Sequence, residues 1–383
     1  MKRWQTDLLR VRRMSWTMLL ATVALCTVGI FFIYSAGYIE GNPSSAGAGK
    51  HQRQIAFAGI GLLGFLGAAA LDYRRLRKLS TWVYMGGIFL LLLVAVIGTV
   101  QYGARRWLTI LPGVSVQPSE LMKLGAIIML ARFLSQPGID LSDVKTVGSA
   151  LAIAGVPFVL IALQPDLSTA MVFVPLTLVM MFVAGVPIRI LLILGLLGLL
   201  LMPFGWFLLG DYQQERILVF LDSDRDPLNA GWSKRQSEIA VGSGGMWGKG
   251  YLRGTQNILG FLPRSVAPTD FIYSVIAEEL GFVGSAAVLL LFAIVIVSGM
   301  RTALLTHDMM GRLLAVGIIT TVFGHLFVNI AMTVGLMPIT GLPLPLLSYG
   351  GSFTVSTLIG LGILQSVHVR RPSRPQWGAM SYG

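Results

Sequence analysis

Long apolar stretches separated by short polar segments dominate the pattern of this chain. Each stretch is close to the ~20 residues that a helix needs to cross about 30 Å of hydrocarbon. The pattern therefore predicts an all-α polytopic integral membrane protein with about ten transmembrane helices. These predicted spans lie at residues 16–34, 54–71, 82–100, 119–134, 148–163, 167–186, 189–209, 270–299, 312–336 and 350–368.

Composition and charge agree with a membrane protein and add an orientation. The chain is 55% hydrophobic and only 12% charged. Lys and Arg gather in the N-terminal tail, at 74–78 and at 368–374, on one side of the predicted bundle. Because basic residues favour the cytoplasmic side, both termini are expected in the cytoplasm. The net charge of +12 is then explained by topology and by anionic membrane lipids, so no nucleic-acid partner is invoked.

A single long polar segment, residues 210–267, interrupts an otherwise single membrane domain of residues 1–383. It lies between the seventh and eighth predicted spans and is expected outside the cytoplasm. Connections of this length are more often functional or internally structured than idle. Its glycine-rich stretch "GSGGMWGKG" at 242–250 fails the spacing of a nucleotide phosphate loop. We expect instead a flexible loop that holds Lys249 and Arg253 near a membrane-bound phosphate.

Metal-binding signals are weak. The stretch "LDSDRDP" at 221–227 resembles a metal-binding Asp-x-Asp pattern, but acidic turns before proline are common. Cys26 is the single cysteine and the four histidines are scattered, which excludes a thiolate site and disfavours a histidine site.

Charges inside predicted spans are the best pointers to function, because they are costly in a bilayer. Glu120 and Lys123 are three residues apart, so a helix places them on one face as a neutralising pair. The pair either joins its span to neighbouring helices or lines a polar cavity. Asp166, in "QPD" at 164–166, is expected to cap the N-terminus of the next helix.

Three carboxylates stand in "PTDFIYSVIAEELG" at 268–281. Asp270 follows a proline and a threonine, which favours its interpretation as an N-cap. A helix turns Glu278 about 80° and Glu279 about 180° away from Asp270, so the three acids do not form one cluster. Glu278 and Glu279 are expected to make buried contacts between helices.

Eight segments in order carry a resemblance to a known family. Together they resemble the shape, elongation, division and sporulation (SEDS) family from about residue 16 to 368, and the elongation members more than the division members. The segments are "RRWLTI", "QPSELMKL", "QPDLSTA", "DYQQER", "GSGGMWGKG", "GTQNILGFLP", "PTDFIYSVIAEELG" and "GLPLPLLSYGGS".

The resemblance implies a peptidoglycan glycosyltransferase of the bacterial inner membrane that polymerises lipid II, an undecaprenyl-pyrophosphate-linked muropeptide. It implies Asp270 as the catalytic base, which takes the proton of an acceptor hydroxyl that attacks with inversion. It implies Glu120 and Lys123 as cavity residues. Substrate-binding roles are expected for Arg106, Gln236, Lys249 and Arg253. The metal stays open, with a divalent cation such as Mg²⁺ or Mn²⁺ as one option.

The same resemblance implies a partner, a class B penicillin-binding protein with transpeptidase activity. Two other function classes stay open at this point: a flippase or transporter of lipid-linked precursors, and a non-catalytic scaffold for the transpeptidase. Polymerisation of purified lipid II separates them, because neither alternative makes glycan. One departure from the family pattern is a stretch before Asp270, "FLPRSVAPTDFI", that is about two residues longer than in elongation members.

Overall fold

A computed structural model describes residues 13–38, 49–101, 104–111 and 114–371 of the chain, and it is mostly helical. The helices are α2 (Trp16–Gly37), α3 (Lys50–Ala70), α4 (Leu76–Ile97), α5 (Pro118–Leu134), α6 (Val144–Ala162), α7 (Leu167–Met171), α8 (Phe173–Ala184), α9 (Ile188–Gly205), α10 (Asp211–Leu221), α11 (Ala230–Ser243), α12 (Thr255–Ile258), α13 (Ile272–Leu305), α14 (Met309–Thr333) and α15 (Gly351–Val369). Short 3-10 turns are η3 (Tyr73–Arg75), η4 (Trp206–Leu208) and η5 (Ser223–Arg225).

Nine stretches of the described residues are long and apolar enough to cross a membrane. They correspond to nine of the predicted spans, which confirms a multi-pass helical membrane protein. The remaining predicted span is α5, which has 17 residues and buries most of them, including both members of the Glu120–Lys123 pair. A helix of that length reaches about 25 Å, so it lies at the short end of what spans a bilayer.

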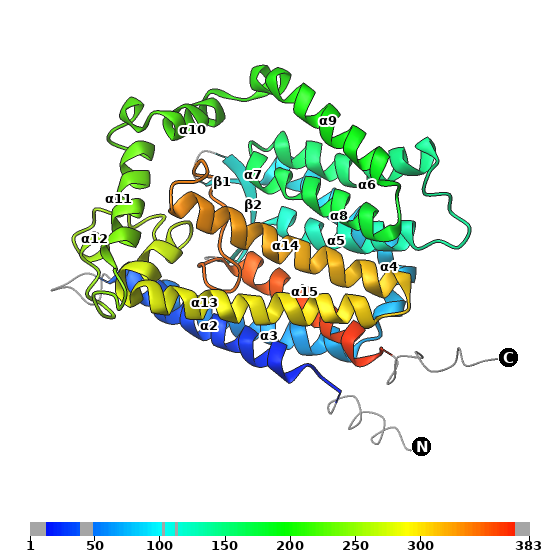
Figure 1. Ribbon diagram of the computed structural model, residues 1–383, viewed down its shortest axis with the longest axis horizontal. Helices are drawn as coiled ribbons and strands as arrows, with labels where there is room; N and C mark the ends of the chain where they lie inside the picture. Colours follow the sequence, from blue (N-terminus) through cyan, green and yellow to red (C-terminus); the bar gives the residue numbers. More distant parts are fainter. Residues whose placement is uncertain (1–12, 39–48, 102–103, 112–113, 372–383) are drawn as a thin grey trace.

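The long helices run side by side, as Figure 1 shows. The first described helix, α2, begins at the same end of the bundle at which α15 finishes, and α10, α11 and α12 lie at the opposite end. The basic tails at 2–12 and 372–374 lie outside the described residues. The cytoplasmic placement of both termini therefore stays a prediction, as does the assignment of residues 1–383 to one domain.

Close approach through glycine joins distant parts of the chain. On α3, a Cβ at Gly61 would lie 2.4 Å from Leu358 Cδ1 of α15. On α15, a Cβ at Gly362 would lie 2.4 Å from the carbonyl oxygen of Phe65. Small residues at helix interfaces allow this contact in membranes, where packing rather than the hydrophobic effect drives association. The second and last spans are thus packed backbone to backbone.

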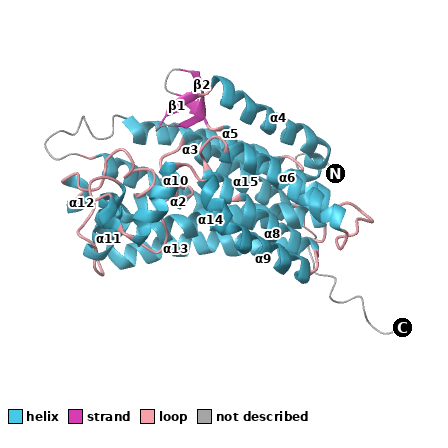
Figure 2. Cartoon of the chain, turned by 90° about the horizontal axis from the view of Figure 1, so that it is seen from above, coloured by secondary structure: helices cyan, strands magenta, loops and turns pink. Residues whose placement is uncertain are grey.

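A small antiparallel sheet was not predicted from the sequence. Its strands are β1 (Thr99–Gln101), β2 (Ala104–Leu111) and β3 (Val114–Val116), in the order β1-β2-β3. The sheet follows α4 and precedes α5, and Figure 2 shows it projecting from one edge of the helical body. It holds Arg106, one of the predicted substrate-binding residues.

The long polar segment at 210–267 is internally structured, as its length suggested. It contains α10, α11 and α12, and α11 packs against α13 and α14. On α11, Ser237 Oγ lies 2.7 Å from Ser274 Oγ of α13 and donates to the carbonyl of Thr333 of α14 at 2.8 Å. The segment is therefore fixed to the first turn of the helix that follows Asp270.

Candidate functional site

Asp270 lies just before α13, at the end of the bundle that carries α10, α11 and α12 (Figure 1). The expectation that Asp270 caps this helix is wrong. The N-cap is Phe271, which makes no capping hydrogen bond through its side chain, and the helix begins at Ile272. The Asp270 carboxylate is therefore not used by the helix terminus and is free for other chemistry.

Arg216 of α10 is the cation that bears on Asp270. Burial raises the pKa of Asp270 to about 6, and the positive charge of Arg216 opposes this rise. Gly341 stands between the two side chains. A Cβ at Gly341 would lie 3.6 Å from Asp270 Oδ2 and 3.8 Å from both terminal nitrogens of Arg216. Because that position has no side chain, only the backbone of Gly341 lies beside the carboxylate and the guanidinium, and a Cβ there would be in van der Waals contact with both.

Arg216 is itself held in place. Its Nη1 donates to the carbonyl of Thr340 at 2.9 Å, its Nη2 donates to the Tyr212 hydroxyl at 2.5 Å, and its guanidinium lies 4.5 Å from the centre of the Tyr212 ring. None of these three contacts involves a carboxylate, so they leave the positive charge of Arg216 unneutralised. This arrangement keeps the Arg216 cation near Asp270 while leaving its charge outside any ion pair.

The backbone before Asp270 is fixed by the segment that precedes α15. Tyr349 donates its backbone N–H to the carbonyl of Pro268 at 2.8 Å, and Ser348 Oγ donates to the carbonyl of Thr269 at 2.5 Å. Ser348 is fully buried. The "GLPLPLLSYGGS" stretch thus supports the "PTDF" stretch directly, although 79 residues separate Thr269 from Ser348.

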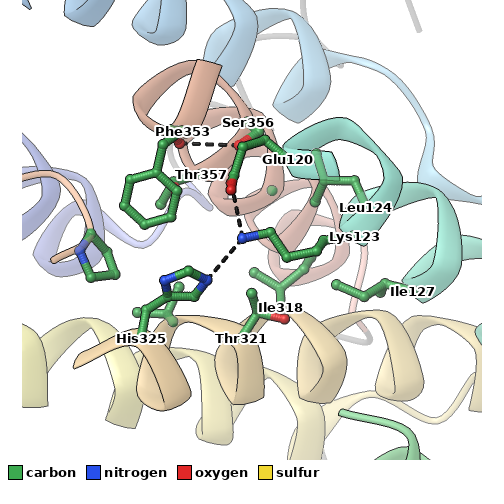
Figure 3. Close-up of a pocket in the computed structure, with 13 residues that line it drawn as sticks. Glu120, Lys123, Leu124, Ile127, Ile318, Thr321, His325, Phe353, Ser356 and Thr357 are labelled. Atoms are coloured by element: carbon green, nitrogen blue, oxygen red, sulfur yellow. Dashed lines mark hydrogen bonds and ion pairs between the residues drawn. The ribbon is translucent and has the colours of Figure 1, made fainter. Parts of the chain in front are cut away.

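The predicted Glu120–Lys123 pair is confirmed. Lys123 Nζ lies 2.9 Å from Glu120 Oε2, and both side chains are almost fully buried. The ammonium also lies 2.8 Å from His325 Nε2 of α14 and 5.2 Å from the centre of the Phe353 ring of α15. Figure 3 shows the Lys123 ammonium between Glu120 and His325, joined to each by a dashed line.

The structure supports the first interpretation of this pair, a link between helices, and the pocket that the pair also lines is mostly apolar rather than a polar cavity. Through His325 the pair joins α5 to α14, and it also forms the polar wall of a pocket whose other walls are mostly apolar (Figure 3). The other lining residues come from α5, α14, α15 and the stretch before α15. They are Leu124, Ile127, Ile318, Thr321, Val322, Pro345, Phe353, Ser356, Thr357 and Gly360.

Arg106 is engaged by the "QPD" stretch. Its guanidinium lies 3.5 Å from Asp166 Oδ1 and donates to the carbonyls of Gln164 and Pro165. Asp166 accepts from the backbone N–H of Thr169 at 3.3 Å, which confirms the predicted N-cap. Arg106 therefore fixes the sheet to the start of α7, and its role toward substrate stays a prediction.

The glycine-rich stretch is packed against a break in α13, where Gly281 has φ 67° and ψ −161°. At Gly244 a Cβ would lie 2.0 Å from the carbonyl oxygen of Ala277, and at Gly248 it would lie 2.1 Å from that of Glu279. Only glycine permits such approaches. The stretch is therefore docked backbone to backbone on α13.

The last three backbone N–H groups of this stretch are already hydrogen-bonded within the protein. Lys249 N donates to the carbonyl of Glu278 at 3.0 Å, Gly250 N donates to that of Glu279 at 2.9 Å, and Gly248 N donates to that of Gly244 at 2.8 Å. A phosphate loop needs these donors pointed at an anion. The glycine-rich stretch is therefore not the flexible loop that we expected, because it is packed and hydrogen-bonded against α13.

Glu278 and Glu279 are buried, as predicted, and they hold the stretch that follows the glycines. Glu278 Oε1 accepts from Lys249 Nζ at 2.7 Å and from the backbone of Gln256 at 2.9 Å. Glu279 accepts from Ser35 Oγ of α2 at 2.5 Å and from the backbone of Leu252 at 3.1 Å. The Lys249 ammonium thus neutralises a buried acid, and a contact with substrate stays a prediction.

Gln236 and Arg253 occupy different surroundings. Gln236 is buried on α11, whereas Arg253 is exposed beside Gly250. The acids of "LDSDRDP" serve local structure: Asp222 caps η5, and Asp226 accepts from Asn229 and Ala230 at the start of α11. In the part of the chain that the structure describes, no three His, Cys, Asp or Glu side chains gather as metal ligands.

Sequence reasoning missed Arg216, His325 and Ser348. Arg216 and Ser348 stand inside the "DYQQER" and "GLPLPLLSYGGS" segments, which were noted without assigning those residues a role. The signal for His325 was a histidine inside an apolar span, where a polar group needs a partner. Its partner, Lys123, is 202 residues away, a distance that periodicity does not bridge.

Comparisons with known proteins agree with this arrangement. Residues 16–373 match the sequence profile of the cell cycle protein family of FtsW, RodA and SpoVE. The peptidoglycan glycosyltransferase MrdB of Escherichia coli (strain K12) is 38% identical over 356 residues, covering 93% of each chain. The peptidoglycan glycosyltransferase RodA of Treponema pallidum (strain Nichols) is 33% identical and covers 95% of this chain and 100% of that protein.

Solved structures give the same result. A chain from work described as "Structural coordination of polymerization and crosslinking by a peptidoglycan synthase complex" aligns with a TM-score of 0.77 at 33% identity, covering 94% of this chain and 99% of that one. The rod shape determining protein RodA of Thermus thermophilus, in a variant with one aspartate changed to alanine, aligns with a TM-score of 0.70 at 30% identity, covering 94% and 98%.

Removing one charge of the buried pair is expected to cost more than removing both. Glu120→Gln or Lys123→Met leaves a lone charge in an apolar core, which costs about 3 kcal/mol or more, whereas the double variant leaves none. The measurement is the thermal midpoint in detergent, with Ser119→Ala, a buried neighbour, as the matched control. If the decrease in thermal midpoint of the double variant equals the sum of the two single decreases, the two charges are not coupled.

Lys249→Met is expected to lower the thermal midpoint by roughly 5 °C or more, because it leaves the buried Glu278 unpaired. Adding Glu278→Gln should recover most of that loss, and Arg253→Met is the control for loss of a positive charge nearby. The half-saturating concentration of lipid II is measured alongside. If the half-saturating concentration is higher in the stable double variant than in the unaltered protein, Lys249 contacts substrate in addition to its structural role.

Proposed function

The chain belongs to the FtsW, RodA and SpoVE family, and from this premise we propose that it polymerises lipid II at the outer face of the membrane with Asp270 as the general base. It is a peptidoglycan glycosyltransferase of the multi-pass inner-membrane type, like MrdB and RodA. The observation that carries the assignment of the base is a carboxylate that caps no helix, with a cation near it and a glycine, which has no side chain, beside both.

The pKa of the Asp270 carboxyl suits this chemistry. A general base works best when its pKa lies near the working pH and the base is still ionised. Burial raises the pKa of Asp270 to about 6, and Arg216 limits the rise, so the carboxylate is charged at neutral pH yet more basic than an exposed aspartate. It takes the proton of the acceptor hydroxyl as that oxygen attacks the anomeric carbon of the donor sugar, while the bond from that carbon to the undecaprenyl pyrophosphate breaks and the pyrophosphate leaves.

The space beside Gly341 is suited to the reacting groups. Gly341 places no side chain beside the base and the fixed cation, so a polar group of the sugar that binds there would meet both. Fixed charges that need no rearrangement during reaction are the most effective stabilisers of developing charge. We assign Arg216 this supporting role, ahead of Arg106 and Lys249, whose charges are used by Asp166 and Glu278.

The partner and the orientation belong to the same proposal. A structural neighbour is part of a complex that coordinates polymerisation with crosslinking, which supports a class B penicillin-binding protein as the transpeptidase partner of this chain. If both termini are cytoplasmic, then Asp270 and helices α10 to α12, at the opposite end of the bundle, face the side where lipid-linked sugars are polymerised.

Asp270→Asn is expected to fold and to lose glycan synthesis by roughly 10²-fold or more, because the amide cannot take a proton. The measurement is the length and yield of glycan made from purified lipid II by the reconstituted protein, with and without the transpeptidase. Near-normal synthesis by the folded variant would remove Asp270 from the role of base. Absence of any glycan from the unaltered protein with its partner would instead favour a flippase or scaffold.

Activity should fall as the pH drops through about 6, because Asp270 must be ionised to act as base. Arg216→Gln removes the charge that opposes the rise in the pKa of Asp270, so this acid limb should move to higher pH. The pH dependence of kcat/KM for lipid II measures the shift, with Arg225→Gln, an exposed arginine of the same segment, as control. An acid limb that stays in place would separate Arg216 from Asp270.

A further inference from the structure

We propose that His325 and Asn329 are positioning residues that connect the buried Glu120–Lys123 pair to the backbone of Asp270 through residues 340–343. The proposal rests on the proposed function, since it assigns these side chains the task of holding the base in place. It starts from the spacing of the two residues, which lie four apart on α14 and therefore point to one side of that helix.

Both side chains meet the 340–343 segment at its carbonyl groups. Asn329 Nδ2 donates to the carbonyl of Leu342 at 2.8 Å, and His325 Nδ1 lies 3.3 Å from the carbonyl of Pro343. Pro343 has no backbone N–H, and both helix residues are buried. Two successive carbonyls are thus fixed by two side chains of a single rigid helix.

The other end of the same segment is fixed from the catalytic side. The carbonyl of Thr340 accepts from Arg216 Nη1 at 2.9 Å and from Ser168 Oγ at 2.6 Å. Gly341 follows, with φ +75°, a conformation that glycine adopts readily, and it borders the space next to Asp270. Any displacement of residues 340–343 therefore changes the distance between Arg216 and the carboxylate.

Asn329 also reaches Asp270 directly. Its Nδ2 donates to the backbone carbonyl of Asp270 at 3.0 Å as well as to that of Leu342. Asn329 is fully buried. A single amide group therefore joins the residue that carries the base to the segment that carries Gly341, and it sets their separation.

His325 connects the 340–343 segment to the buried Glu120–Lys123 pair. The Lys123 ammonium can only donate, so His325 Nε2 must accept, and the ring proton is then on Nδ1, where it points to the carbonyl of Pro343. Glu120 balances the charge of Lys123. Loss of Lys123 removes the contact that selects this tautomer, and the ring is then free to turn away from Pro343.

The size of the expected effect follows from the demands of proton transfer. A displacement of about 1 Å between catalytic group and substrate can cost roughly 10²-fold in rate. A positioning role therefore predicts a lower kcat with an almost unchanged KM for lipid II. If Lys123 or His325 instead contacted the substrate, its loss would raise KM for lipid II and leave kcat almost unchanged.

The first experiment compares partial mimics of His325 in reconstituted lipid II polymerisation. His325→Asn keeps a donor near the Nδ1 position, His325→Gln keeps an acceptor near the Nε2 position, and His325→Leu keeps neither. We expect kcat to fall about 10-fold in each mimic and about 10²-fold in His325→Leu, with KM within about twofold. Combining His325→Leu with Asn329→Ala should cost little more than the worse single change, because both act on one segment.

Ser356→Ala is the matched control. Ser356 lines the same pocket as His325, but its hydroxyl donates to the carbonyl of Phe353 within its own helix. We expect it to leave kcat and KM unchanged. If the His325 variants keep their kcat, or if they raise KM alone, the positioning role is wrong.

A second experiment measures how accessible position 270 is, in variants that need not be active. Cys26 is the only cysteine, so Cys26→Ala together with Asp270→Cys leaves one thiol at the site of the base. Adding His325→Leu should raise the rate of reaction of that thiol with a small maleimide several-fold, whereas adding Ser356→Ala should not. An unchanged rate would overturn the proposal even if Asn329 variants fail to fold. Because these proteins lack the base, the result does not depend on whether Asp270 is the catalytic residue.

Discussion

A carboxylate buried in an apolar helix bundle must find a cation or several hydrogen-bond donors, and this requirement organises the structure around residues 268–281. Glu278 is met by Lys249 and by a backbone N–H, and Glu279 by Ser35 and a second backbone N–H. These contacts fix the polar segment onto α13. Asp270 is stabilised by the charge of Arg216 and by the Thr269 side chain, and no ion pair or helix cap occupies it, so of the three acids it is the one left to react.

The same requirement explains which cations are available for chemistry. Arg106 is committed to Asp166, and Lys123 to Glu120. Arg216 is held by a carbonyl and by the Tyr212 ring and hydroxyl, none of which cancels its charge. Charge that is fixed but not neutralised is what a site needs in order to stabilise a reaction that moves a proton and releases a diphosphate.

Sequence alone predicted what depends on local pattern. Apolar length gave the spans, and the spacing of Glu120 and Lys123 gave the pair. The N-cap assignment of Asp270 failed because the chain makes a turn before the helix begins, and propensity does not reveal it. The glycine stretch was misjudged because glycine permits mobility and close packing equally, and the partner backbone lies in another helix.

The contacts that define the site join residues far apart in the chain, such as Lys123 with His325 and Ser348 with Thr269. No periodicity in one sequence reports them, so the roles of Arg216, His325 and Asn329 came from the structure. The family resemblance pointed to the correct segments for Lys123, Arg216, Thr269 and Ser348, which all lie in the eight motifs. It did not include His325 or Asn329, and it did not indicate which side chains in each motif face the base.

The most direct test of this account is a structure of the protein with a lipid II acceptor bound, in which the distance from the Asp270 carboxylate to the attacking hydroxyl is measured. The account predicts that the hydroxyl lies within hydrogen-bonding reach of the carboxylate, roughly 2.6–3.2 Å, in the space beside Gly341. An acceptor hydroxyl held instead by Glu120 or Glu278, with Asp270 outside hydrogen-bonding distance, would contradict it.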